Sequence, residues 1–169
     1  MTPEALSADL REGESAALAN RRGVAALSFL SMASLGAVAL FQLGILKNLP
    51  EPPGRLWNAA KVNGSAEAYS YFGVPDAFLG VASYAVTAAL AAAGPDDRAR
   101  SQPWLPIAMA GKAAVDAIQA AKLTFDSWTK YRAFCLFCLV AAGATIATLP
   151  LAWKEMQAAL ETLRSESRA

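Results

Sequence analysis

Four long apolar segments constrain the fold of this 169-residue chain more than any other feature. The first has no charged residue and is long enough to cross a hydrocarbon core of about 30 Å, which takes roughly 20 helical residues. The second and fourth also have uncharged interiors. Because a chain of this length suggests one domain, the segments predict an all-α, integral membrane four-helix bundle. The segments are residues 23–46, 75–93, 103–125 and 131–153.

The third segment differs because polar side chains recur along it every three or four residues. A charge inside the bilayer costs at least ~2.5–3.5 kcal/mol on insertion scales, so we expect these side chains to face the bundle interior. The alternative is an amphipathic helix lying at the membrane surface. Its i,i+4 charged pair could relay protons, although we prefer an internal ion pair that sets helix register. The polar stripe comprises Lys112, Asp116, Gln119 and Lys122.

The basic residues predict the orientation of the bundle. Four spans place both termini on one side, where eight lysines and arginines would lie, against five on the other side. The positive-inside rule then predicts polar cytoplasmic tails at 1–22 and 154–169, flanking a membrane domain at 23–153. The loop at 47–74 and the turn at 126–131 would face outward, which in a bacterial inner membrane is the oxidising periplasmic side.

Composition removes several classes of function. The chain has no histidine, which excludes histidine-ligated haem, histidine-based zinc sites and Ser-His-Asp catalysis. Two cysteines are too few for a disulfide-stapled scaffold or a four-cysteine zinc site, so we expect no metal. A net charge of +1 gives no reason to expect a nucleic-acid partner, whereas the apolar segments make membrane lipid the expected surrounding.

The two cysteines, Cys135 and Cys138, lie at the outward end of the fourth segment. Residues at this spacing share one face of a helix, so both sulfurs can meet. A Cys-x-x-Cys pair near a helix N-terminus gains thiolate character from the helix dipole, and a thiolate is a competent nucleophile in disulfide exchange. We therefore predict a redox-active pair. The alternative is two cysteines that only pack as small hydrophobic residues.

Two stretches of the chain resemble the vitamin K epoxide reductase (VKOR) family. The stretch WTKYRAFCLFCLV at 128–140 is similar to the start of that family's fourth helix, where a CxxC faces a quinone. The stretch YFGVPDAFLG at 71–80 is similar to the Phe-Gly-x-Pro stretch that opens the family's second helix. The order and spacing of both stretches fit, and the resemblance covers about residues 23–153.

The resemblance implies a VKOR-like four-helix bundle around a quinone of the ubiquinone, menaquinone or vitamin K type, capped by the first loop. By analogy Cys138 would face the quinone and Cys135 would exchange with an incoming dithiol. A loop serine helps to position the loop over the site in the family. Ser65 is the best match for it here, with Ser70 as the rival.

Aromatic residues near both stretches are candidates for the quinone site. Phe72, Phe78 and Trp128, with Tyr131 and Phe137, could wall a flat ring, because such sites are mostly apolar with a few polar groups. They could equally belong to an aromatic belt at the membrane interface.

The chain departs from the family pattern in the first loop, which lacks the family's second cysteine pair. Residues 58–61 stand near its expected position, so no intramolecular shuttle can pass electrons to Cys135. We predict a membrane thiol–quinone oxidoreductase that receives electrons from an external thioredoxin-like dithiol protein or from a different reductant. The alternative is a non-catalytic membrane module that binds a quinone, a lipid or a partner subunit. A third possibility is a small transporter that uses the polar stripe.

Overall fold

The computed structural model describes residues 1–168, which are mainly helical and contain no β-strand. This confirms the predicted all-α class. The elements are α1 (Pro3–Glu12), α2 (Ala16–Gln42), α3 (Ala59–Asn63), the 3-10 helix η1 (Ala66–Tyr69), α4 (Asp76–Ala92), α5 (Arg98–Ser101), α6 (Trp104–Asp126), the π-helical turn η2 (Ser127–Tyr131) and α7 (Leu136–Glu166).

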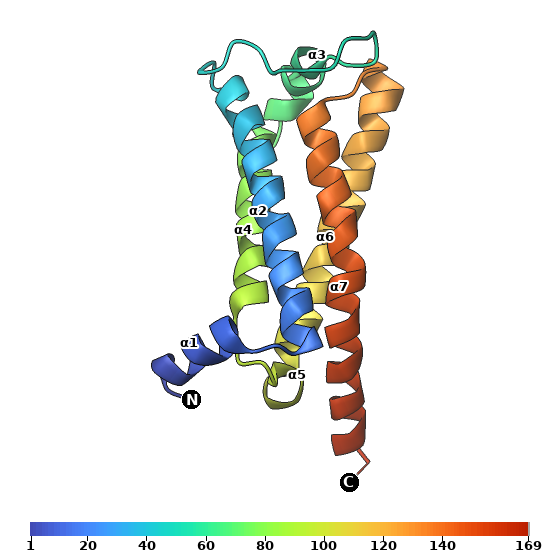
Figure 1. The fold of residues 1–169 in the computed structure, drawn as a ribbon. Coiled ribbons are helices and arrows are strands. Elements are labelled where there is room, and N and C mark those ends of the chain that lie inside the picture. Colours follow the sequence, from blue (N-terminus) through green and yellow to red (C-terminus); the bar gives the residue numbers. More distant parts are fainter. Residues whose placement is uncertain (169) are drawn as a thin grey trace.

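Four long helices, α2, α4, α6 and α7, lie side by side in an elongated bundle (Figure 1). Helix α2 packs extensively against α4 and α7, and α6 packs against α7, whereas α4 and α6 contact each other only sparsely. The connection that contains α3 crosses one end of the bundle, and both termini lie toward the other end (Figure 1).

Two of the four helices, α2 and α7, are long and apolar enough to cross a membrane. Helix α4 is apolar but shorter. Four membrane crossings therefore stay a prediction. Helix α7 also continues beyond residue 153, so most of the predicted C-terminal tail is a helical extension of the bundle.

Small residues allow α2 to approach its neighbours closely. The Ser34 hydroxyl of α2 donates to the Phe137 carbonyl oxygen of α7 at 2.9 Å. Gly80 of α4 faces Leu35 of α2, where a Cβ atom would collide with the leucine side chain. Small and hydroxyl residues at helix interfaces bring backbones together and hydrogen-bond across them. These contacts place the N-terminal end of α7 beside α2 and α4.

Buried charged residues join the helices at the opposite end. Arg21 of α2 donates to four carbonyl oxygens at and just after the end of α4, each at 2.9 Å. A helix end leaves such carbonyls without intrahelical partners. Arg98 of α5 forms two hydrogen bonds of 2.7 Å with Glu155 of α7. All three side chains are buried, although the sequence suggests only cytoplasmic surface charges here.

Candidate redox site

The connection at 43–75, called the cap below, lies over the N-terminal end of α7. Trp57 forms a parallel β-bridge with Phe134. The Asn58 amide donates to the Phe134 carbonyl at 3.0 Å, and the Phe134 amide donates to the Leu56 carbonyl at 2.7 Å. Because Phe134 directly precedes the first cysteine, these bonds hold the cap against the CxxC motif.

Charged residues at the edge of the cap make further contacts with η2. The Lys61 ammonium donates to the Tyr131 carbonyl at 2.8 Å. The Glu67 carboxylate accepts from Lys130 and from the Tyr131 hydroxyl. The hydrogen bond from Lys130 is the main reason that the pKa of Glu67 lies below its ordinary value. These groups are solvent-exposed, so each contact is weak by itself.

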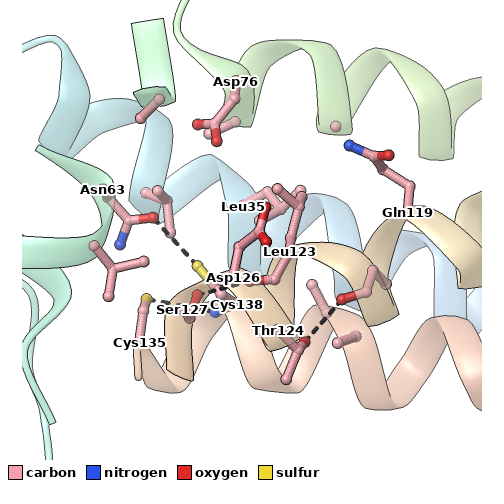
Figure 2. Close-up of a pocket in the computed structure, with 18 of the residues that line it drawn as sticks. Leu35, Asn63, Asp76, Gln119, Leu123, Thr124, Asp126, Ser127, Cys135 and Cys138 are labelled. Atoms are coloured by element: carbon pink, nitrogen blue, oxygen red, sulfur yellow. Dashed lines mark hydrogen bonds between the residues drawn. The ribbon is translucent and has the colours of Figure 1, made fainter. Parts of the chain in front are cut away.

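Cys135 and Cys138 are both free thiols, and they occupy different positions relative to α7. Cys135 is the N-cap residue, with an extended backbone, and its sulfur accepts from the Cys138 amide at 3.4 Å. Cys138 lies in the first turn, and its thiol donates to the Asn63 side-chain oxygen at 3.3 Å (Figure 2). Cys135 is only 1 % exposed because the cap covers it.

The contacts of Cys135 with Cys138 at the start of α7 affect the reactivity of the Cys135 thiol. Hydrogen bonding from the Cys138 side chain lowers the pKa of the Cys135 thiol to about 7, although burial opposes the shift. A sizeable fraction is therefore thiolate at neutral pH. Because the thiolate is the reactive form, Cys135 is suited to attack an incoming disulfide or to leave from a mixed disulfide.

Both cysteines line a cavity of about 330 Å³ between the cap and the bundle. This volume lies in the range of small-molecule sites, which are mostly apolar with a few polar groups. Leu35, Leu79 and Leu123 contribute apolar walls from α2, α4 and α6. The chemistry of this lining fits an apolar ring that carries polar oxygens.

A network of buried amides connects the cap to the cavity wall. Gln42, at the end of α2, donates from one nitrogen to the Asp76 carboxylate at 2.7 Å and to the Asn63 carbonyl at 3.2 Å. Its side-chain oxygen accepts from the Ala77 amide at 3.3 Å. The Asn63 side chain in turn donates to the Ala59 carbonyl at 3.0 Å and accepts from the Cys138 thiol. The network therefore positions Asn63 over Cys138.

The structure brings three of the predicted site residues together. Cys135, Cys138 and Ser65 all line the cavity. The Ser65 hydroxyl donates to the Val62 carbonyl at 3.0 Å, which stabilises the cap just after α3. The rival serine, Ser70, is exposed, donates to a carbonyl within η1 and does not line this cavity.

Of the five candidate aromatic residues, Tyr131 lines this cavity, whereas Phe72, Phe78, Trp128 and Phe137 lie outside its lining. Phe72 is 93 % exposed and has a left-handed backbone with φ of 55°. Phe78 lines a shallow groove on the outer side of α2 and α4. Trp128 stacks on Phe134 with ring centroids 5.6 Å apart, and the Arg132 guanidinium lies 5.2 Å from the Trp128 ring. Contact of these aromatic residues with a quinone stays a prediction.

The polar stripe of α6 lies toward α4 and the cavity. Asp116, Gln119 and Lys122 line the cavity, and the Lys112 ammonium is 2.6 Å from the Asp116 carboxylate. Asp116 also accepts from a serine and a threonine hydroxyl of α4 at 2.8 and 3.0 Å. Because the Lys112 ammonium contacts both carboxylate oxygens, Asp116 accepts four hydrogen bonds in all.

Sequence reasoning missed the amide and carboxyl residues that surround the cysteines. Asn63, Gln42 and Asp76 are far apart in the sequence and match no motif of redox chemistry. Asp76 directly follows the Phe-Gly-x-Pro stretch, which is the one local signal that could have drawn attention to it.

Comparison with known proteins identifies the family of the chain. The sequence model described as the vitamin K epoxide reductase family matches residues 22–153, which include most of α2, all of α4 and α6, the first part of α7, the cap and both cysteines. No individual curated protein matches the chain.

Proposed function

The chain belongs to the vitamin K epoxide reductase family, whose members are membrane oxidoreductases that act with quinones, and from this premise we propose a specific reaction. The protein is a membrane thiol–quinone oxidoreductase with Cys135 and Cys138 as its redox pair. The observation that carries the proposal is that both thiols line one largely apolar cavity beneath the cap.

The two cysteines have different roles in this proposal. Cys135, with a pKa of about 7, exchanges with an external dithiol or disulfide. Cys138 faces the cavity and is held by Asn63. Oxidation of the pair forms one Sγ–Sγ bond and releases two electrons and two protons. A bound quinone would supply the capacity to accept both, held by the apolar walls and the cap, which exclude water.

The electron donor is proposed to be a thioredoxin-like protein, since the chain has no other cysteines. Because Cys135 is 1 % exposed, the donor can reach it only if the cap moves. This movement breaks the weak exposed contacts of Lys61 and Glu67 with η2 and also the backbone hydrogen bonds between the cap and Phe134. We place this end of the bundle on the periplasmic side of a bacterial inner membrane, as the basic residues predict.

Quinone reduction in membrane vesicles tests the proposal. Vesicles that contain the full chain would be given a dithiol and a short-chain quinone, and quinol formation would be followed optically. Cys138→Ala and Cys135→Ala should each reduce the rate to background, whereas Ser165→Ala on the exposed end of α7 should not change it. Activity retained in Cys138→Ala would contradict the proposal.

A second test uses the redox state of the native pair. Thiols would be alkylated with a mass tag in membranes with and without quinone synthesis. A disulfide that becomes a dithiol on quinone depletion supports the oxidoreductase. Thiols that stay reduced under both conditions would favour the non-catalytic module, for which the missing loop cysteines are the supporting observation.

A further inference from the structure

Four carboxylates line the cavity, and one of them differs from the rest. Three are ion-paired to lysines: Asp116 with Lys112 at 2.6 Å, Asp126 with Lys122 at 3.0 Å, and Glu67 with Lys130. The fourth, Asp76, has no lysine or arginine within ion-pair distance in the described part of the chain, residues 1–168. Asp76 is therefore the cavity carboxyl whose charge is not compensated by a neighbouring cation.

A neutral amide holds Asp76 in place. Gln42 donates to its Oδ1 at 2.7 Å, and the same amide is anchored by Ala77 and Asn63. An amide donor can hold a carboxyl group in either protonation state, because one oxygen remains an acceptor when the other carries the proton. A change in protonation at Asp76 therefore leaves its anchoring bond intact.

Asp76 and Cys138 belong to the same cavity and share one support. Figure 2 shows Asp76 at the start of α4 pointing toward the space beside Cys138, with Asn63 on the same side. Asn63 accepts from the Cys138 thiol, and its backbone carbonyl accepts from the amide that holds Asp76. The sulfur and the carboxyl are thus positioned by one buried network.

We propose that Asp76 is the proton-exchange residue of the cavity. The proposal rests on the proposed function and extends it. When the Sγ–Sγ bond forms, each sulfur loses one electron. Cys135 reacts as the thiolate, so its proton has already gone to solvent, and the Cys138 proton leaves as the bond forms. Asp76 accepts, through water in the cavity, the proton that leaves Cys138 and passes it to the bound acceptor, which also receives both electrons, so that the carboxylate is regenerated.

The other three carboxylates are less suited to this role. Protonation of Asp116, Asp126 or Glu67 would remove the negative charge from an existing ion pair and leave its lysine unpaired. The Asp116 pair is largely buried, and loss of one partner of a buried ion pair is strongly unfavourable. Glu67 and Asp126 are paired with exposed lysines, and the hydrogen bonds from these lysines lower the pKa of both carboxyl groups, which keeps them charged. Asp76 has no such pair to lose.

Infrared difference spectroscopy tests the proposal without a quinone. Ferricyanide would oxidise the dithiol of the purified full chain, because it accepts electrons but no protons. In spectra recorded during the oxidation, before the proton equilibrates with solvent, we expect a transient deuterium-sensitive carboxyl band in the oxidised-minus-reduced difference of the wild type. The band should vanish in Asp76→Asn, shift in Asp76→Glu and persist in Glu161→Gln, a matched change on the exposed end of α7. A wild type without the band, or a band that survives in Asp76→Asn, overturns the proposal.

Turnover provides the second measurement. Asparagine keeps an oxygen that accepts from Gln42, so Asp76→Asn should fold, but it cannot exchange a proton. General acid–base groups contribute about 10²–10⁴-fold to rate, so we expect a loss of at least about 100-fold in Asp76→Asn and substantial retention in Asp76→Glu.

The two proposals fail in different ways. Wild-type turnover with unchanged turnover in Asp76→Asn overturns the role of Asp76 and leaves the oxidoreductase in place. A wild type that reduces no quinone contradicts the oxidoreductase instead, and the infrared band alone then decides whether Asp76 takes up a proton on thiol oxidation.

Discussion

The two ends of the bundle bury polar groups in opposite ways. At the end near the termini, the buried side chains of Arg21 and Arg98 donate to carbonyl oxygens, and Arg98 also donates to the buried Glu155 carboxylate. At the cap end, the side chains of Cys138 and Asp76 belong to one hydrogen-bond network and also line the cavity. A saturated network favours a single structure, whereas one that borders a cavity can act on a ligand.

The two ends of the bundle should differ in the free energy of unfolding that a substitution costs. Removing one partner of a fully buried ion pair leaves an uncompensated charge and costs several kcal/mol. Removing a residue beside the cavity leaves groups that water or a ligand can reach. The loss of stability should therefore be smaller than at the buried ion pair, and the loss of activity larger. The predictions below test this difference, from the largest expected effect to the smallest.

Glu155→Ala should destabilise the protein by about 3–5 kcal/mol, because the Arg98 guanidinium would remain buried without its carboxylate. Thermal or denaturant unfolding in detergent micelles would measure the loss. Glu161→Ala, at an exposed position on the same helix, is the control. A loss below about 1 kcal/mol, the scale of a surface ion pair, would show that the buried Arg98–Glu155 pair does not stabilise this end of the bundle.

Cys138→Ala should raise the pKa of Cys135 from about 7 toward 9.0, because it removes the hydrogen bond that is the main cause of the lowered value. The fraction of thiolate at neutral pH should fall on the order of tenfold or more. The alkylation rate of Cys135 across neutral and alkaline pH measures this, with Ser165→Ala as the control. An unchanged midpoint would mean that Cys138 does not set the reactivity of Cys135.

Asn63→Ala should slow quinone reduction about tenfold, the equivalent of one lost hydrogen bond of about 1.4 kcal/mol. It removes the acceptor for the Cys138 thiol and the donor to the Ala59 carbonyl. The matched change Asn58→Ala removes only the N-cap hydrogen bond of α3, in which the Asn58 side-chain oxygen accepts from the Lys61 amide. Equal effects of the two variants on turnover would assign Asn63 to cap folding rather than to the thiol.

Glu67→Gln should expose Cys135 roughly two- to threefold more often at neutral pH, because it weakens one exposed contact of the cap. The pKa of Glu67 is depressed below 4.5 in the folded protein, so its contribution is present above that value and is lost as pH falls through the lowered folded value. A pyridyl disulfide, which reacts with thiols in acid, would measure the access.

The wild type and the Glu67→Gln variant should therefore converge at acid pH and differ at neutral pH. Lys61→Met, which removes the neighbouring contact without a titrating carboxyl, should keep its difference from the wild type across this pH range. A difference that grows in acid would contradict a role for Glu67 in holding the cap.

Much of the fold followed from patterns that are local in the sequence. The apolar segments predicted the positions of the four long helices, because hydrophobic runs and helical periodicity act over neighbouring residues. The ends were less accurate: the fourth segment predicted a start near Tyr131, but η2 and an extended stretch precede α7, which begins at Leu136. Arg132 ends η2 with a left-handed backbone, which the sequence did not signal.

The site was predicted in part. The CxxC motif and Ser65 were chosen from motif and spacing, which are readable along the chain, and they line the cavity, but their roles stay predictions. The aromatic choices were less informative, because Phe72 and Phe78 share their sequence stretch with Asp76 but lie outside the cavity lining while Asp76 faces it. Which side of a short connection faces inward depends on packing between distant elements, which no local pattern encodes.

The sequence by itself determined the all-helical class, the family and the one pair of sulfurs that redox chemistry could use. The tertiary structure decided what surrounds them. Asn63 lies over Cys138, and Asp76 lacks the lysine that its three counterparts have, only because the cap folds onto the ends of α2, α4 and α7. Covalent spacing determines which residues can meet within a helix, but long-range packing alone determines which charges are paired and which face a cavity.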